Sequence, residues 1–167
     1  MTDIVINCLT TQFPYLEGKI KEQRPGRIFI DPLREEEFRP VFDYIIDELG
    51  YKDFHMLVGR DSGDTMHVIY LLTDGGANML CPKLEVSKEN PVIRSIYDRF
   101  SNCTWHELEL VDLLGFVVEG LPEGLPNYPL PDGWPEGSHP LRKDWKAEYF
   151  DKDTLTYNPP GPGKPES

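Results

Sequence analysis

The clearest hydrophobic pattern in the chain is that of a helix. Apolar side chains recur at spacings of three and four, which places them on one stripe of an amphipathic helix. The stripe consists of Phe38, Val41, Phe42, Ile45, Ile46 and Leu49. Glutamates 35–37 suit the positive N-terminal end of this helix, and Gly50 suits its C-terminal stop. Because proline is tolerated only in the first turn of a helix, Pro40 predicts that the regular helix begins near Glu36 or Glu37.

Three further runs have the pattern of strands. Residues 51–59 alternate apolar and polar side chains, and residues 79–86 form a third apolar run. Residues 65–73 carry apolar side chains in both alternating sets, which predicts a strand that is covered on each face. Turns are expected at residues 60–64 and 74–76. Because proline cannot donate to a ladder, Pro82 predicts that the third strand lies at a sheet edge or contains a bulge.

The remaining elements before residue 117 are shorter. Residues 27–30 predict a strand that Asp31 and Pro32 stop, whereas residues 2–16 fit a short helix or a strand equally well. Residues 91–100 and 105–114 are each expected to be helical, the second closed by Gly115. The sequence therefore predicts an α+β domain over residues 1–116. Its form is a two-layer sandwich of a small, mostly antiparallel sheet with helices on one side.

The chain changes character after Phe116. Ten of its sixteen prolines follow that residue, and they disfavour both helices and paired strands, leaving extended chain. The segment is nevertheless richer in large apolar side chains than a solvated linker. They are Leu121, Leu125, Tyr128, Leu130, Trp134, Leu141, Trp145, Tyr149 and Phe150. Ordering residues 117–145 costs on the order of 30–60 kcal/mol, which a second protein surface can offset. Residues 117–157 are therefore predicted to be a docking tail, and residues 158–167 a flexible end.

Composition narrows the class of protein. The 167 residues suit one domain with an appendage, and the net charge of -12 argues against nucleic acid or an anionic bilayer as the direct partner. The three cysteines lack a Cys-x-x-Cys spacing, which argues against a disulfide framework, a zinc knuckle or an iron–sulfur cluster. The sequence shows neither a signal peptide nor a long apolar run, so we expect any membrane attachment to occur through partners.

Candidate chemistry is sparse. Glu107, Glu109 and Asp112 fit a solvated helix face or an ionic interface better than a catalytic pair. Asp112 opposes the helix dipole, which predicts a compensating cation such as Arg142 or Lys143. Of the four histidines, His55 and His67 are expected to face one another across a hairpin, and His106 follows Cys103 by three residues. No set of three converging metal ligands is evident, and no phosphate-binding glycine loop or nucleophile elbow occurs.

Two stretches carry a family resemblance. Residues 105–116 read WHELELVDLLGF, and residues 137–145 read GSHPLRKDW. They resemble the signatures W-x-E-R-E-x-x-D-L-x-G-I and G-H-P-L-R-K-D-[YFW] of the 30-kDa subunit family of respiratory complex I (NADH dehydrogenase) and its relatives in membrane-bound nickel–iron hydrogenases. Leu108 replaces the usual arginine, Phe116 the usual isoleucine, and Ser138 is an insertion. The approach LPDGWPE, residues 130–136, is closer to the hydrogenase branch.

The resemblance implies a structural subunit in the hydrophilic arm of a membrane-bound, ion-translocating oxidoreductase. Such a subunit has no catalytic residue and binds no cofactor or metal; iron–sulfur clusters, and nickel–iron in the hydrogenase branch, would belong to its partners. It would dock the large hydrogenase-like or 49-kDa-like subunit and the small iron–sulfur subunit. It would lie at the cytoplasmic face of the cell membrane and meet the membrane arm only indirectly. The implied interface residues are Trp105, Glu107, Glu109, Asp112, Gly115, Phe116, Trp134, His139, Pro140, Leu141, Arg142, Lys143, Asp144 and Trp145.

Three alternatives remain open at this point. The first is the 30-kDa-type subunit of a quinone-reducing enzyme that takes electrons from NADH or another donor. The second is a free-standing cytosolic enzyme that uses His106, Glu107 and Glu109. The third is a small adaptor for an unrelated protein.

Overall fold

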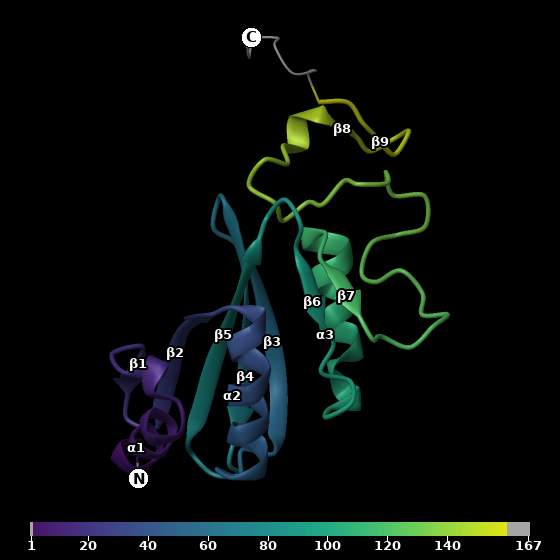
Figure 1. Cartoon of the computed structure of the whole chain (residues 1–167). Helices are drawn as coiled ribbons and strands as arrows, with labels where there is room; N and C mark the ends of the chain where they lie inside the picture. The colour runs from purple at the N-terminus through teal and green to yellow at the C-terminus, as the bar shows by residue number, and fades with distance from the viewer. Residues whose placement is uncertain (1, 160–167) are drawn as a thin grey trace.

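The computed structural model describes residues 2–159, and its centre is a five-stranded sheet (Figure 1). The strand order is β1-β2-β5-β4-β3. Neighbouring strands are antiparallel except β2 and β5, which are parallel. The bounds are β1 (Ile20–Arg24), β2 (Arg27–Leu33), β3 (Asp53–Asp61), β4 (Thr65–Thr73) and β5 (Met79–Ser87). The three predicted strands are therefore confirmed, whereas β1 carries no apolar alternation and was missed.

Two helices cover one face of the sheet, α1 (Thr2–Gln12) and α2 (Glu35–Asp47). The rings of Phe38 and Phe42 pack on Tyr70 of β4 at 4.8 and 5.5 Å between centroids. The two-layer α+β prediction is thus confirmed. The expected start of α2 was wrong, because the helix begins at Glu35 and Pro40 lies in its second turn. Glu36, whose carbonyl loses its partner at Pro40, is exposed, so water can satisfy it.

The position of β5 corrects another prediction. The strand is internal rather than at an edge, and Pro82 pairs with Ile30 of β2. The irregularity that proline requires is present beside it, because β2 shifts register between Ile30 and Leu33. β2 consequently continues through Asp31 and Pro32, which were expected to stop it.

Residues 91–100 do not form the predicted helix. They begin with a short strand, β6 (Val92–Arg94), which pairs in parallel with β7 (Val117–Glu119). The β-branched residues Val92 and Ile93 favour this conformation. Between β6 and β7 lie α3 (Thr104–Glu109) and a continuing π-helical turn, η3 (Leu110–Leu114), so the second predicted helix is confirmed.

Residues 120–146 contain no helix or strand. A 3-10 turn follows, η4 (Ala147–Tyr149), and then a small hairpin of β8 (Phe150–Asp151) and β9 (Thr156–Tyr157). Proline therefore did not exclude paired strands from the tail, although those present are very short. Of the end predicted to be flexible, residues 160–167 lie outside the described part of the chain. The other 3-10 turns are η1 (Pro14–Leu16) and η2 (Ser101–Cys103). No helix within residues 2–159 is long and apolar enough to cross a bilayer.

Candidate docking surface

The two signature stretches come together in the structure. The tail lies across the C-terminal end of η3, where helix carbonyls lack partners of their own. Arg142 donates from Nε to the Leu114 carbonyl at 2.6 Å and from Nη2 to the Gly115 carbonyl at 3.1 Å. The backbone N–H of Leu141 donates to the Leu113 carbonyl at 2.9 Å. A cation here also suits the negative end of the helix dipole.

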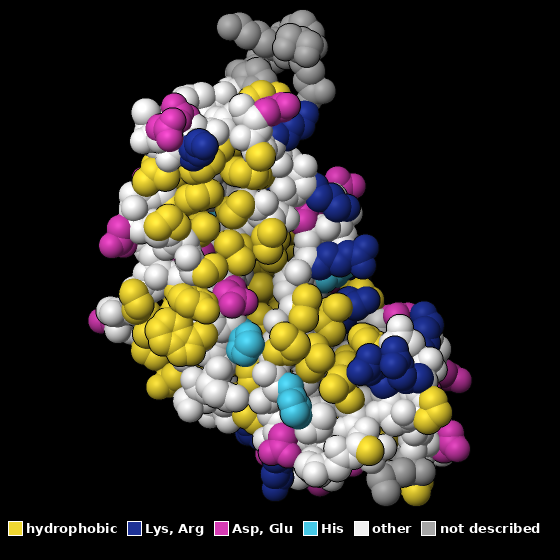
Figure 2. All heavy atoms as spheres, turned by 180° about the vertical axis from the view of Figure 1, so that it is seen from behind, with side chains coloured by type: hydrophobic (Ala, Val, Ile, Leu, Met, Phe, Trp, Pro, Cys, Tyr) yellow, Lys and Arg dark blue, Asp and Glu magenta, His cyan; other side chains and the backbone are white. Residues whose placement is uncertain are grey.

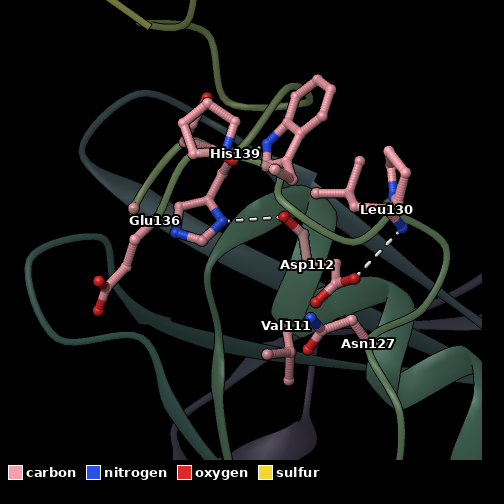
Figure 3. A pocket seen from close by; sticks show the side chains of 11 residues that line it. Val111, Asp112, Asn127, Leu130, Glu136 and His139 are labelled. Carbon is pink, nitrogen blue, oxygen red and sulfur yellow. Dashed lines mark hydrogen bonds between the residues drawn. The ribbon is translucent and has the colours of Figure 1, made fainter. Parts of the chain in front are cut away.

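Asp112 takes part in this junction differently from what the sequence predicted. Its carboxylate accepts the backbone N–H of Leu130 at 3.3 Å, and its carbonyl accepts Nδ1–H of His139 at 2.9 Å (Figure 3). Arg142 and Lys143 do not form an ion pair with it within residues 2–159. Arg142 therefore compensates the helix carbonyls, and a bidentate contact with a buried carboxylate is not its role in this chain.

Gly115 makes the close approach possible. It ends η3 with φ at +71°, the left-handed region that favours glycine. A Cβ added there would lie 2.5 Å from His139 and 2.8 Å from Arg142. A side chain at this position would therefore push the tail away from the helix end.

Asp61, which the sequence analysis missed, joins the tail to the sheet. One carboxylate oxygen accepts both Lys88 Nζ, at 2.8 Å, and the backbone N–H of Lys143, at 2.9 Å. The other accepts the N–H of Gly63 at 2.8 Å, and Lys88 Nζ lies 3.4 Å from Asp144. Burial alone would raise the pKa of Asp61, but these hydrogen bonds and the charge of Lys88 lower it to about 2.

Glu107 is part of the core and does not lie on a solvated helix face. It has no exposed surface, and its carboxylate accepts Ser95 Oγ–H at 2.6 Å and the Ile96 N–H at 3.0 Å. Burial raises its pKa. A side chain with no exposed surface cannot contact a substrate or a partner, so Glu107 leaves both the predicted interface and the alternative catalytic set. Phe116 is buried as well.

The tail has a small aromatic cluster of its own. Trp134 stacks on Phe150 at 4.6 Å and Trp145 on Tyr157 at 5.6 Å. Both indoles bond to Ser138: Trp134 Nε1–H to its carbonyl at 2.7 Å, and Trp145 Nε1–H to its hydroxyl at 2.8 Å. The inserted serine is therefore the buried centre of the tail.

A polar pocket of about 350 Å³ lies between this cluster and the helix (Figure 3). Val111 and Asp112 line its helix side, and residues of the tail such as Asn127, Leu130 and Glu136 line the rest. The hydrogen bonds of Asp112 to Leu130 and His139 cross between the two sides. The pocket therefore marks the seam along which the tail attaches.

An apolar groove of about 250 Å³ runs between β3 and the helical segment α3–η3. It is lined by Met56, Leu57, Val58, Gly59, His106, Glu109, Leu110, Leu113, Leu114 and Leu141. Leu141, from the tail, is 59% exposed, and Trp105 on α3 is 52% exposed. Trp105 is held edge-on by Tyr128 of the tail, with ring centroids 5.1 Å apart. The joined stretches thus present large apolar side chains to solvent next to a groove.

The histidines do not assemble a metal site. His55 contacts Thr73, and His67 lies between Ser62 and Glu85, so the two do not face one another as predicted. In the part of the chain that the structure describes, no three His, Cys, Asp or Glu residues are placed to hold a metal ion.

The structure thus divides the predicted interface residues into three groups. Trp105, Leu141, Lys143 and Asp144 are exposed, and Glu107 and Phe116 are buried. The rest are half-buried and mostly hold the tail to the helix: Glu109, Asp112, Gly115, Trp134, His139, Pro140, Arg142 and Trp145. Met56, Val58 and Lys88 were missed along with Asp61, because strand alternation gave no indication of which face would stay open.

Comparison with known proteins gives a family match over most of the chain. Residues 32–151 match the model of a family described as respiratory-chain NADH dehydrogenase, 30 Kd subunit. The chain is 26% identical over 151 residues to membrane-bound hydrogenase subunit beta of Pyrococcus furiosus, covering 87% of this chain and 86% of that protein. It is 38% identical over 118 residues to an NADH-quinone oxidoreductase subunit of Roseiflexus castenholzii, covering 67% and 66%. It spans only 44% of the corresponding Chloroherpeton thalassium protein, at 34% identity.

Two solved structures share the fold. A chain of the membrane-bound sulfane sulfur reductase, an archaeal respiratory membrane complex, superposes with a TM-score of 0.74 at 17% identity, covering 94% of this chain and 99% of that one. The trypsin-resistant fragment of Nqo5 superposes with a TM-score of 0.57 at 22% identity, covering 69% and 98%. At these identities the likeness concerns the fold alone.

Proposed function

Because the chain belongs to the 30-kDa subunit family of respiratory-chain NADH dehydrogenase, we propose that it is a non-catalytic docking subunit of a membrane-bound, complex I-like oxidoreductase. Its relatives are named as subunits of such complexes, which supports the broad assignment. The finer assignment is to the hydrogenase-type branch. The hydrogenase subunit is matched over 86% of its length, which supports that choice over a quinone-reducing complex.

The partners we propose are the large hydrogenase-like subunit and the small iron–sulfur subunit, with all redox cofactors in those chains. The chain would lie at the cytoplasmic face of the membrane, peripheral and held through these partners. The observation that carries the proposal is the exposure of Leu141 and Trp105 beside the apolar groove. Large apolar side chains clustered at an open groove are typical of protein interfaces.

The test is substitution of Leu141 by Asp in the chromosomal copy, followed by purification of the complex through a tag on the large subunit. Placing a charge in an apolar contact should lower the amount of this chain retained by about tenfold. Ile4→Asp is the matched control, because Ile4 is 66% exposed on α1, away from the groove. Equal retention of both variants would contradict the proposal.

A further inference from the structure

The second face of the sheet is uncovered. Helices pack on one face of β4 through Tyr70, whereas no helix or loop among residues 2–159 packs on the face that carries Ile69 and Leu71. The pattern of residues 65–73 predicted a strand covered on both sides, and the described chain supplies only one cover. The missing cover is the observation from which the inference starts.

The strand registers show that this open face is apolar across its middle. Val58 pairs with Ile69, which pairs with Lys83, and Met56 pairs with Leu71. On the other side of β5, Cys81 pairs with Phe29. Met56 and Val58 are 40% and 43% exposed. These residues form a continuous strip over four strands, and the strip adjoins the apolar groove at β3, where Met56 and Val58 belong to both.

The charges around this strip are unlike those of the whole chain. Arg27, Arg60 and Lys83 lie on the open face, and none of them forms an ion pair within the described residues. In Figure 2, hydrophobic side chains occupy the middle of this face and Lys and Arg side chains flank them. The acids there are otherwise engaged or peripheral. Asp31 pairs with Lys21, Glu85 pairs with His67, and Asp53 lies at the start of β3.

We propose that this open sheet face is a second docking surface, and that it receives a protein surface with an apolar centre and an acidic rim. An apolar strip gains free energy when it is covered, and an acidic rim would neutralise three cations that now lack partners. The inference rests on the proposed function, since the occupant is another subunit of the same oxidoreductase.

Two other occupants fit less well. A second copy docking through the same face would set Arg27, Arg60 and Lys83 against one another, and like charges in an interface are costly. Nucleic acid and anionic lipid reward many clustered cations, whereas this chain offers three beside an apolar strip and carries a net charge of -12.

The test uses the complex purified through its large subunit. Zero-length carbodiimide joins an amine only to a carboxylate in contact with it, so Lys83 should cross-link to Asp or Glu of another subunit. Lys83→Glu should lower retention of this chain by about tenfold, whereas Lys152→Glu, an exposed cation in the β8–β9 hairpin, should leave it unchanged. Lys83 lies at an open strand position and its reversal leaves the core intact.

The outcomes separate the two proposals. If Leu141→Asp releases the chain but Lys83 gives no intersubunit cross-link, or Lys83→Glu is retained like the wild type, this inference is wrong and the proposed function stands. A cross-link from Lys83 to a second copy of the chain also overturns it. If the wild-type chain does not co-purify with oxidoreductase subunits at all, the proposed function fails, and this inference fails with it.

Discussion

The sandwich and the tail are held in place by different forces. Residues 2–116 enclose a continuous apolar core between the sheet and its helices. Between residues 117 and 159, Ser138 alone is buried. The tail is positioned instead by hydrogen bonds to the end of η3 and to Asp61. The comparison teaches that the sandwich supplies stability, while the tail supplies shape at little apolar cost and keeps its large side chains available for a partner.

The largest difference should appear when one aromatic ring is removed from each region. Phe42→Ala deletes a ring with no exposed surface and should lower the free energy of unfolding by about 3–5 kcal/mol. Trp134→Ala removes the ring that stacks on Phe150 and should lower it by less than about 1 kcal/mol, while hydrogen exchange in residues 134–145 accelerates. Chemical denaturation with exchange mass spectrometry measures both. A similar loss of global stability from the two variants would break the distinction.

Asp61→Asn should have an intermediate effect, because it weakens the contact between the two regions. The folded pKa of Asp61, about 2, lies below its ordinary value of 3.8, so its contribution is present above pH 4 and is lost as the pH falls from 4 toward 2. The difference corresponds to about 2 kcal/mol.

The asparagine variant should lose that stability at pH 7 and show a shallower decline between pH 4 and pH 2. It should also lose exchange protection at the Lys143 amide, which donates to Asp61. Asp151→Asn is a suitable control, because Asp151 is an exposed hairpin carboxylate whose pKa is lowered only by local backbone and hydroxyl hydrogen bonds. An unchanged acid profile for Asp61→Asn would count against a stabilising contact between Asp61 and the tail.

Gly115→Ala should have a smaller effect on global stability but a local one on the tail. The left-handed conformation costs a residue with a Cβ about 1–2 kcal/mol. The added Cβ also meets His139 and Arg142, so residues 139–142 should detach and become sensitive to proteolysis. Gly124→Ala, also at positive φ but with open space around it, separates the conformational cost from the displacement. Equal proteolysis of the two variants would show that close approach at Gly115 is unimportant.

The sequence was informative where burial is periodic and uninformative where contacts are polar and distant. The stripe from Phe38 to Leu49 and the alternation in residues 51–86 predicted α2 and the β3–β5 meander, because one covered face leaves a regular pattern. Residues 91–100 misled, since a run with apolar residues three apart fits a helix as well as a strand and turn. No periodicity records a side chain that bonds to backbone, so the attachment of Arg142 to η3 was not predicted. Asp61 and Lys143 are 82 positions apart, which local reasoning does not connect.

The family signatures helped in a different way. They indicated that residues 105–116 and 137–145 matter together, and the structure gives the physical reason, since the second stretch caps the helix formed by the first. They did not reveal which of their residues face outward. Glu107 and Phe116 turn out to serve the core, whereas Trp105 and Leu141 are the ones that a partner can reach.

The most direct test of docking is hydrogen exchange of this chain, compared between the free protein and the purified oxidoreductase complex. Our account predicts that residues 56–59, 105–109 and 139–143 gain protection in the complex, because they border the apolar groove, while the amides of α2 do not change. Unchanged exchange at the groove, with new protection elsewhere, would contradict it.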